Sequence, residues 1–207
     1  MLRIFDFLFP PRADEIIVRN TSDDSFLALV APRLVDETRP ATVALLPFQN
    51  VMVRAAIHEA KYHGSARALK LLGSALVEYL RDADDVGLVT SRVRLVPVPL
   101  GKERRKNRGF NQVEEVARCA LRILDGNFIL NIDLLERVKE TQSQISLERR
   151  RREENMRGAF VATRRADPAY TYIVIDDVIT TGATLQAAVD ALQDAGAEHI
   201  IPLALAH

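Results

Sequence analysis

Cysteine is almost absent from this sequence of 207 residues, since Cys119 is the only one. A single thiol excludes an intrachain disulfide framework and a cysteine-rich zinc site. No apolar run reaches the length of a membrane span, and the opening residues MLRIFDFLFPPR are too short and too interrupted for a secretory leader. We therefore expect a cytoplasmic protein without a membrane span.

An excess of charge of either sign is absent as well. The chain has 28 basic and 28 acidic residues and a formal net charge of zero, so it has no overall field that would attract nucleic acid. Basic residues do gather in two stretches, Lys102–Arg108 and Arg149–Arg152. These stretches keep nucleic acid open as a partner, although four consecutive arginines on a helix point in different directions and cannot all serve one ligand.

Two common nucleotide-binding fingerprints are missing too. There is no GxxxxGK[ST] segment and no GxGxxG after a strand, which argues against a P-loop NTPase and against a dinucleotide-binding domain. The sequence contains instead YIVIDDVITTGAT, residues Tyr172–Thr184. Its β-branched start is typical of a strand buried on both faces of a parallel sheet. Two acids, a turn of small hydroxyl residues and an alanine-rich helical pattern follow.

This stretch has the chemistry of a site for a ribose 5-phosphate. Backbone N–H groups and hydroxyls of Thr180–Thr184, at the start of a helix, can hold a phosphate, and Gly182 lets the backbone come close to it. The carboxylates of Asp176 and Asp177 suit ribose hydroxyls, which donate hydrogen bonds, and a hydrated Mg²⁺ can assist. The alternative is an ordinary strand, turn and helix with an acidic strand end.

Strand and helix patterns alternate through most of the chain, which predicts an α/β fold with a doubly wound parallel sheet flanked by helices. Residues Phe48–Asp82 are predicted to form two helices, separated at Gly64 and with Ser65 as the N-cap of the second. The other expected elements are strands at Arg94–Pro99, Ile132–Leu135, Gly158–Ala162 and Ile200–Ala206, and helices at Phe110–Ile123 and Ala183–Ala195.

The pattern is weaker before residue 48. We expect helical turns over Met1–Phe9, a short strand at Ile16–Val18 and a short helix within Ser25–Val35. These expectations divide the chain into an N-terminal extension, residues 1–47, and a main domain, residues 48–207.

A basic loop is expected on the same edge of the sheet as the TTGAT turn. In parallel α/β sheets, ligands bind at the carboxyl ends of the strands, and Leu100–Arg108 follows the strand that ends near Pro99. Basic side chains there can hold a pyrophosphate, and Arg108 is the side chain that we expect to do so. His58 and His63 are interpreted as solvated residues rather than as metal ligands.

Four segments occur in a characteristic order: IHEAKYHG; VPVPL with RGFNQ; RVKETQSQISLERRRREEN with GAF; and VIDDVITTGAT. Together they resemble the ComF family of competence-associated phosphoribosyltransferase-like proteins, which is similar to the PRPP half of amidophosphoribosyltransferase. The resemblance implies a type I phosphoribosyltransferase fold, here with a helical N-terminal extension. It also implies PRPP and Mg²⁺ as ligands.

The resemblance assigns roles to individual residues. Asp176, Asp177 and Arg108 are implied to be catalytic, and Mg²⁺ is implied to bind through PRPP with help from the two acids. The implied PRPP-binding residues are Asp176, Asp177, Val178, Thr180, Thr181, Gly182, Ala183 and Thr184. The implied pyrophosphate-binding residues are Leu100, Gly101, Lys102 and Arg108. The flexible loop that would close over the site contains Lys139, Thr141, Gln142 and Gln144. Lys61 and Tyr62 are further candidates for contact with the site.

Two departures limit what the resemblance implies. Many members of the family carry two CxxC pairs near the N-terminus as a zinc ribbon, whereas ADEIIVRN stands here without cysteine. Hypoxanthine–guanine salvage enzymes have an acid at the position of Thr180, so purine salvage of that type is disfavoured. The acceptor is left unidentified.

Three functions stay open at this point: a Mg²⁺-dependent phosphoribosyltransferase, a PRPP- or nucleotide-binding regulator without turnover, and a DNA-uptake accessory that binds single-stranded DNA or other competence proteins. A homo-oligomer is compatible with each of them.

Overall fold

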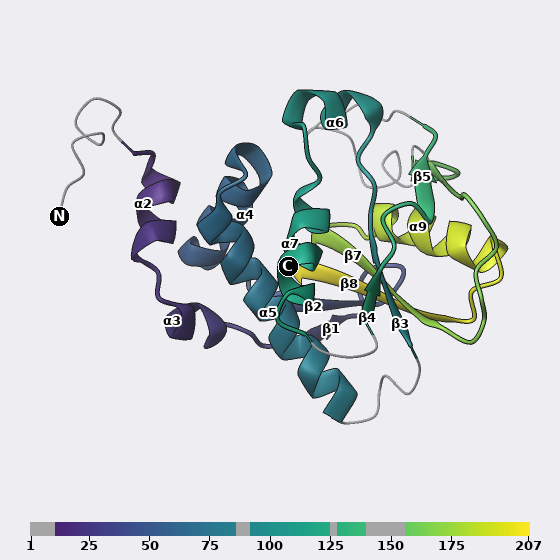
Figure 1. The fold of residues 1–207 in the computed structure, drawn as a ribbon, viewed down its shortest axis with the longest axis horizontal. Coiled ribbons are helices and arrows are strands. Elements are labelled where there is room, and N and C mark those ends of the chain that lie inside the picture. Colours follow the sequence, from purple (N-terminus) through teal and green to yellow (C-terminus); the bar gives the residue numbers. More distant parts are fainter. Residues whose placement is uncertain (1–10, 86–91, 125–127, 140–155) are drawn as a thin grey trace.

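The computed structural model describes residues 11–85, 92–124, 128–139 and 156–207. Six strands within these ranges form one sheet, and helices cover both of its faces (Figure 1). The strand order is β1-β2-β8-β7-β3-β4. All neighbouring strands run parallel except β1, which pairs antiparallel with β2 at the edge. The strands are β1 (Arg33–Val35), β2 (Thr42–Leu46), β3 (Val93–Pro97), β4 (Phe128–Leu130), β7 (Thr171–Val178) and β8 (His199–Ala206).

Strand β7 lies in the middle of the sheet and is the strand that carries the predicted site. Ile175 pairs with Leu203 of β8 on one side and with Pro97 of β3 on the other. Side chains of β7 alternate between two apolar clusters, with Ile173 in one and Val174 in the other. This alternation explains why the strand is apolar without interruption, because both of its faces are covered.

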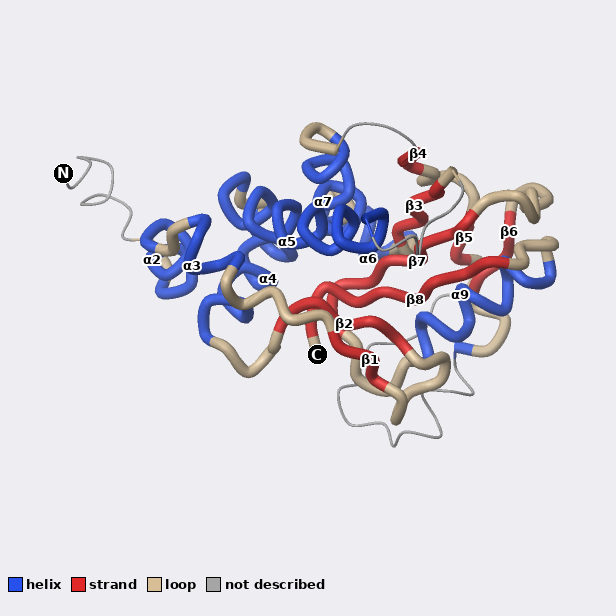
Figure 2. Tube along the Cα trace, turned by 90° about the horizontal axis from the view of Figure 1, so that it is seen from below, coloured by secondary structure: helices blue, strands red, loops and turns tan. Residues whose placement is uncertain are grey.

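Two layers cover the sheet, as Figure 2 shows from below. On one face lie α4, α5 and α7, and on the other lie α9 and the antiparallel pair of strands β5 and β6. Gly73 of α5 lets α7 come close, since a Cβ there would lie 2.8 Å from the Cβ of Cys119. The elements are α4 (Val51–His63), α5 (Ala66–Asp85), α7 (Gln112–Leu121), α9 (Ala183–Asp194), β5 (Leu135–Arg137) and β6 (Phe160–Ala162).

The main expectations for the fold are confirmed at this level: an α/β chain with a mostly parallel sheet between helices. The helix break at Gly64 is present, with the glycine at φ +58°. Ser65 caps the following helix, because its Oγ accepts a hydrogen bond from the Ala68 N–H at 3.4 Å. Strands β7 and β8 and helices α7 and α9 also lie where the sequence predicts them, to within a few residues.

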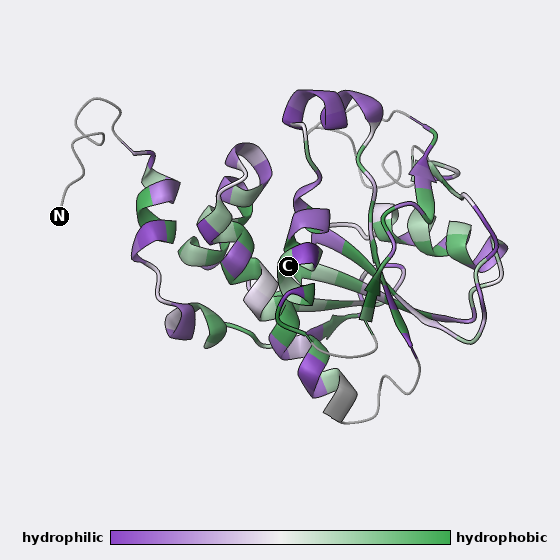
Figure 3. Cartoon of the chain, in the orientation of Figure 1, coloured by the Kyte–Doolittle hydropathy of each residue, from purple (hydrophilic) through white to green (hydrophobic). Residues whose placement is uncertain are grey.

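The prediction of a basic loop after β3 is wrong, because this segment forms the helix α6 (Lys102–Arg108). Gly101 stands at its N-cap and Gly109, at φ +78°, at its C-cap. No residue of this helix is buried, so it has no apolar stripe by which the sequence could reveal it. In Figure 3 it is uniformly hydrophilic.

Two predictions near the N-terminus are also wrong. Ile16–Val18 lies inside the helix α2 (Ala13–Asn20), where the packing of Val18 outweighs the β-propensity of the three residues. The helix expected within Ser25–Val35 is limited to α3 (Asp23–Leu27), and the same segment ends in strand β1.

The predicted strand at residues 132–135 is displaced, since β5 begins only at the last of these residues. Strand β4 was not predicted at all.

Residues 11–47 are closely joined to the rest of the chain. Strand β2 pairs with β8 in the central sheet, and α2 packs on α4. The predicted boundary at residue 47 thus falls between a strand of the sheet and the helix that follows it. Met1–Phe9, the basic stretch Arg149–Arg152 and the loop residues Thr141, Gln142 and Gln144 lie outside the described residues. Among the helices that are described, none combines the length and apolar character that a membrane crossing requires.

Candidate functional site

The two predicted acids lie at the carboxyl end of β7, where each one fixes the backbone that follows it. Asp176 Oδ1 accepts a hydrogen bond from the Asp177 N–H, and Asp177 Oδ1 accepts one from the Val178 N–H, both at 2.8 Å. One oxygen of each carboxylate is thus used inside the strand end. The function of each acid depends on what its other oxygen contacts.

Asp177 is held by two side chains from distant helices. Its Oδ2 lies 2.8 Å from Nζ of Lys61 on α4 and accepts a hydrogen bond of 2.8 Å from Nε2 of Gln112 on α7. Only 8% of Asp177 is exposed. A buried carboxylate needs such partners, because an unpaired charge in the interior is costly. This acid is therefore fixed in position.

Asp176 is in a different environment. Its Oδ2 has no hydrogen bond to any other residue in the part of the chain that the structure describes, and the residue lines a small cleft with the turn that follows. Burial, reinforced by the negative charge of Asp177, raises the pKa of Asp176 to about 7. Lys61 and Arg137 oppose this shift with their positive charges. Asp176 is thus the acid with a free oxygen for a ligand.

The predicted phosphate turn forms the rest of this cleft. Its lining runs from Val178 to Leu185 and includes Thr180, Thr181, Gly182, Ala183 and Thr184. Gly182 is the N-cap of α9, and the Oγ of Thr181 accepts a hydrogen bond from the Ala183 N–H at 3.4 Å. The first turn of a helix has N–H groups without intrahelical acceptors, so this end of the cleft has the donors that an anion site requires.

The connection between β1 and β2 supports the turn from behind. A Cβ on Gly182 would lie 2.8 Å from the Arg39 carbonyl oxygen and 3.0 Å from the Cβ of Thr38. Thr38 is buried, and its Oγ donates to the Val35 carbonyl at 3.1 Å. Glycine is required at residue 182 by this close approach as well as by its φ of +79°.

The four predicted pyrophosphate-binding residues are not all brought together. Leu100 and Lys102 line an open recess of about 400 Å³, whereas Arg108 lies at the other end of α6. Arg108 donates a hydrogen bond of 2.9 Å to the Gln112 Oε1, so it joins the network of Asp177. Gly101 is the buried N-cap of α6. The full lining of the recess is Pro99, Leu100, Lys102, Arg105, Lys106, Leu135, Glu136 and Arg137.

Two residues of the site were not predicted. Gln112 stands in the RGFNQ segment, next to Asn111, which is the N-cap of α7. The Asn111 side chain donates a hydrogen bond of 3.0 Å to the Val98 carbonyl, and this bond fixes the start of the helix beside β3. Arg137, 9% exposed, acts electrostatically on Asp176 and also lines the recess. The sequence shows Gln112 and Arg137 as residue types. It does not show that they contact or act on the acids, because those acids lie in a distant segment.

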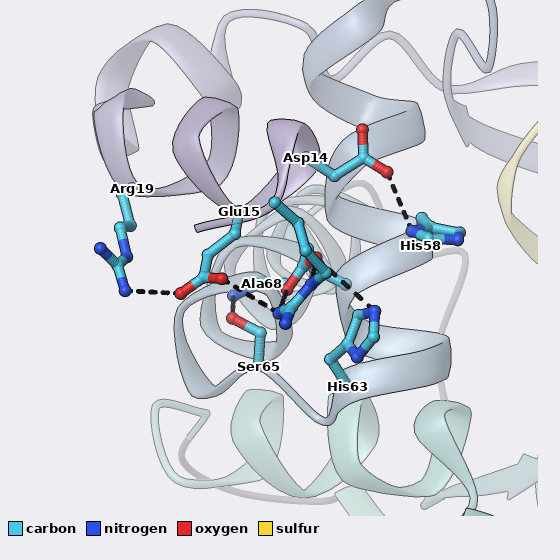
Figure 4. A network of polar contacts seen from close by, with 9 residues as sticks. Asp14, Glu15, Arg19, His58, His63, Ser65 and Ala68 are labelled. Atoms are coloured by element: carbon cyan, nitrogen blue, oxygen red, sulfur yellow. Dashed lines mark hydrogen bonds and ion pairs between the residues drawn. The ribbon is translucent and has the colours of Figure 1, made fainter. Parts of the chain in front are cut away.

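A second polar cluster joins α2 to α4 (Figure 4). Arg12 donates to both carboxylate oxygens of the buried Glu59, at 3.0 and 2.8 Å, and His58 lies 2.9 Å from Asp14. Donor atoms of His58, Glu59 and His63 lie within 4.8 Å of one another, as in a metal site. Because Arg12 occupies both oxygens of Glu59, the cluster instead fastens α2 to α4.

Comparison with known proteins gives relatives of one kind. Competence protein F of Haemophilus influenzae is 32% identical over 133 residues, which cover 63% of this chain and 57% of that protein. Competence protein ComFC of Bacillus subtilis is 35% identical over 103 residues, 49% of this chain and 39% of that protein. Competence protein ComFC of Streptococcus pneumoniae is 30% identical over 140 residues, 68% of this chain and 56% of that protein.

The chain spans about half the length of the curated relatives that it matches. No protein-family model matches it. The three relatives support the resemblance to the ComF family.

Proposed function

We propose that this chain is a ComF protein with a type I phosphoribosyltransferase fold that binds PRPP together with Mg²⁺. The observation that carries the proposal is the position of the acids. Asp176 and Asp177 lie at the carboxyl end of the central strand β7, and the turn Thr180–Thr184 that follows the strand contains the N-terminus of α9. A sugar phosphate can thus place its hydroxyls on the acids and its phosphate on the turn.

The two acids would have unequal roles in this complex. Asp176 Oδ2 is available in the cleft, so it would accept the ribose hydroxyls first. The carboxylate oxygens of Asp176 are hard donors of the kind that Mg²⁺ prefers, which fits a metal held by PRPP with help from this acid. Bound there, Mg²⁺ would neutralise charge on the departing pyrophosphate. Asp177, fixed by Lys61 and Gln112, would hold the strand end in shape.

The recess beside α6 is the proposed place for the pyrophosphate. Lys102, Arg105, Lys106 and Arg137 line it, and four cations suit a group with several negative charges. Arg137 acts electrostatically on Asp176 as well, which connects the recess with the ribose end of the site. Arg108 would act through Gln112 and Asp177 rather than on the pyrophosphate.

Loss of pyrophosphate from the anomeric carbon gives an oxocarbenium-like transition state, which needs cations on the leaving group and a firmly held ribose. The residues above supply both, so the proposed activity is transfer of a phosphoribosyl group to an acceptor. A PRPP-binding regulator would keep the same contacts and lack turnover. Release of pyrophosphate in the presence of candidate acceptors separates the two.

Calorimetric titration of PRPP, with and without Mg²⁺, tests the proposal. We expect Mg²⁺-dependent binding at micromolar concentration that is lost in Asp176→Asn/Asp177→Asn. A matched control is Asp194→Asn/Glu198→Gln, which makes the same change of charge at exposed positions. Unchanged binding in the site variant would reject the site, and no binding at millimolar PRPP would reject the proposed ligand.

Helix α6 favours a second candidate, a competence accessory that binds single-stranded DNA. Five of its seven residues, KERRKNR, are basic and none is buried, and the relatives are named competence proteins. Binding of this kind falls steeply with salt. A salt-sensitive gel shift with an oligonucleotide that is lost in Lys102→Ala/Arg105→Ala/Lys106→Ala, without Mg²⁺-dependent PRPP binding, would favour this candidate over the first.

A further inference from the structure

Tyr62, near the end of α4, is an exposed aromatic residue beside the proposed PRPP site. It is 55% exposed, and among the residues that the structure describes it is the only aromatic one in the group of exposed large hydrophobic residues. The Arg108 guanidinium carbon lies 5.3 Å from the centre of its ring, and the His58 ring lies 4.7 Å from it at a tilt of 52°. Its ring is thus held in place and still open to solvent.

Contacts between side chains connect Tyr62 to the acids. Arg108 donates a hydrogen bond of 2.9 Å to Gln112, and Gln112 donates one of 2.8 Å to Asp177. Lys61, the residue before Tyr62, forms the ion pair with the same carboxylate oxygen. Two separate links from one helix end therefore lead to the end of β7.

The backbone around Tyr62 is fixed as well. Gly64 ends α4 in the left-handed conformation, and the ring of Phe110 lies 3.2 Å from where a Cβ would be. The segment from Arg108 to Gln112 is thus packed against the end of α4. An exposed ring on a rigid support loses little conformational freedom when a ligand stacks on it.

We propose that Tyr62 and Arg108 form a stacking platform for a planar, aromatic acceptor of the phosphoribosyl group. This inference rests on the proposed function, because only a PRPP site gives the platform an acceptor to hold. An aromatic ring and a guanidinium plane both bind the face of a heterocycle, whereas neither selects a small aliphatic amine. The acceptor class is therefore a nucleobase-like or benzoate-like ring rather than ammonia or an alkyl amine.

The experiment uses the absence of tryptophan from the chain. Tyr62→Trp places a single indole at the platform, and its fluorescence reports stacking. Tyr170→Trp is the matched control, since Tyr170 has a similar contact with Arg94, at 4.2 Å, but lies at the start of β7, opposite to the acids. The probes are adenine, uracil, nicotinate and anthranilate as planar rings, and ammonium and glutamine as non-planar amines, each with Mg²⁺ and PRPP.

We expect saturable quenching of Tyr62→Trp by at least one planar probe, no saturable quenching of Tyr170→Trp, and none by the two amines. In calorimetry, Tyr62→Leu should weaken the binding of that same probe roughly 5- to 100-fold, which is the range expected for the loss of one stacked ring. PRPP affinity should stay unchanged in Tyr62→Leu. Absence of saturable quenching by every planar probe, or equal quenching in the control variant, would overturn the platform.

The two proposals fail in different ways. If PRPP does not bind while a planar probe still quenches Tyr62→Trp selectively, the proposed function is rejected and the platform stands as a binding site for planar rings. If PRPP binds and all planar probes fail, the platform is rejected and the PRPP site stands.

Discussion

Lys61 Nζ lies 2.8 Å from Asp177 Oδ2, joining the helix α4 to the end of the central strand β7. The contact is partly enclosed, with 27% of the lysine side chain and 12% of the aspartate side chain exposed. Asp176 is the acid whose second oxygen has no hydrogen-bond partner among the residues that the structure describes. One ion pair thus divides two neighbouring carboxylates into a structural one and an available one.

We predict that Lys61→Met lowers the free energy of unfolding by about 1–3 kcal/mol at neutral pH, because it leaves a buried carboxylate with one partner fewer. Urea unfolding measures the change. Lys70→Met is the control, since Lys70 is paired with Asp23 at 3.0 Å with side chains 58% and 39% exposed. An exposed pair contributes at most about 1 kcal/mol. Equal losses in both variants would contradict the structural role of Lys61.

Asp176→Asn is predicted to stabilise the protein at pH 8 while it weakens PRPP binding. Burial and the charge of Asp177 raise the pKa of Asp176 to about 7, so above that pH the native state holds an unfavourable charge. A raised carboxyl pKa means that stability falls as pH rises from about 4 to about 7. The variant should gain on the order of 1–3 kcal/mol at pH 8, or a few degrees in Tm.

The pH dependence supplies the check. At pH 4 to 5, where Asp176 is protonated in the native state, the advantage of Asp176→Asn should shrink. Asp194→Asn, on an exposed position of α9, should show no such trend. A gain in Tm that stays the same from pH 4 to pH 8 would mean that the charge of Asp176 is not its cause.

The part of the site that the sequence predicts is the part built from consecutive residues. The strand β7, the two acids, the turn at Thr180–Thr184 and the helix α9 follow one another, so hydrophobic pattern, glycine and helix start are all visible locally. Gln112 and Asp177 are 65 positions apart, and nothing in either segment indicates their hydrogen bond. Arg137, whose positive charge acts on Asp176, is likewise brought there by the tertiary structure alone.

Two errors in the fold have a similar origin. Helix α6 has no buried residue, so an amphipathic pattern does not exist to be found. Ile16–Val18 has the composition of a strand, but Asp14 and Glu15 favour a helix N-terminus and Arg19 favours its end. Packing against α4, which no local pattern records, decides in favour of the helix.

The attachment of α2 gives a third prediction. The hydrogen bond from Arg12 holds the pKa of Glu59 below its usual range. A lowered carboxyl pKa stabilises the native state fully above the ordinary value near 4.5, and this contribution is lost as pH falls below that value. Arg12→Ala should therefore lower Tm at pH 7, and its Tm should approach that of the original protein below pH 4.

Arg19→Ala is the control for this prediction, because it also removes a positive charge from α2, where Arg19 pairs with Glu15 at 2.5 Å and its side chain is 44% exposed. It should change Tm little at either pH. If Arg12→Ala and the original protein differ equally at pH 7 and pH 3.5, the Glu59 carboxylate is not what Arg12 stabilises.

The support of the turn Thr180–Thr184 gives the last prediction, for which the chain offers a matched pair of glycines. Gly182 and Gly109 have almost the same φ, +79° and +78°. A Cβ on Gly182 would meet the Arg39 carbonyl oxygen at 2.8 Å, whereas a Cβ on Gly109 would meet nothing within 4 Å. Gly109→Ala therefore carries only the cost of a left-handed alanine, about 1–2 kcal/mol. Gly182→Ala carries that cost and the displacement of backbone, so its free energy of unfolding should fall by at least about 1 kcal/mol more.

Urea unfolding compares the two variants, and PRPP calorimetry should show lost binding in Gly182→Ala alone. Because the shared φ cancels in this comparison, equal stability and equal binding would mean that the β1–β2 connection does not hold the turn in place.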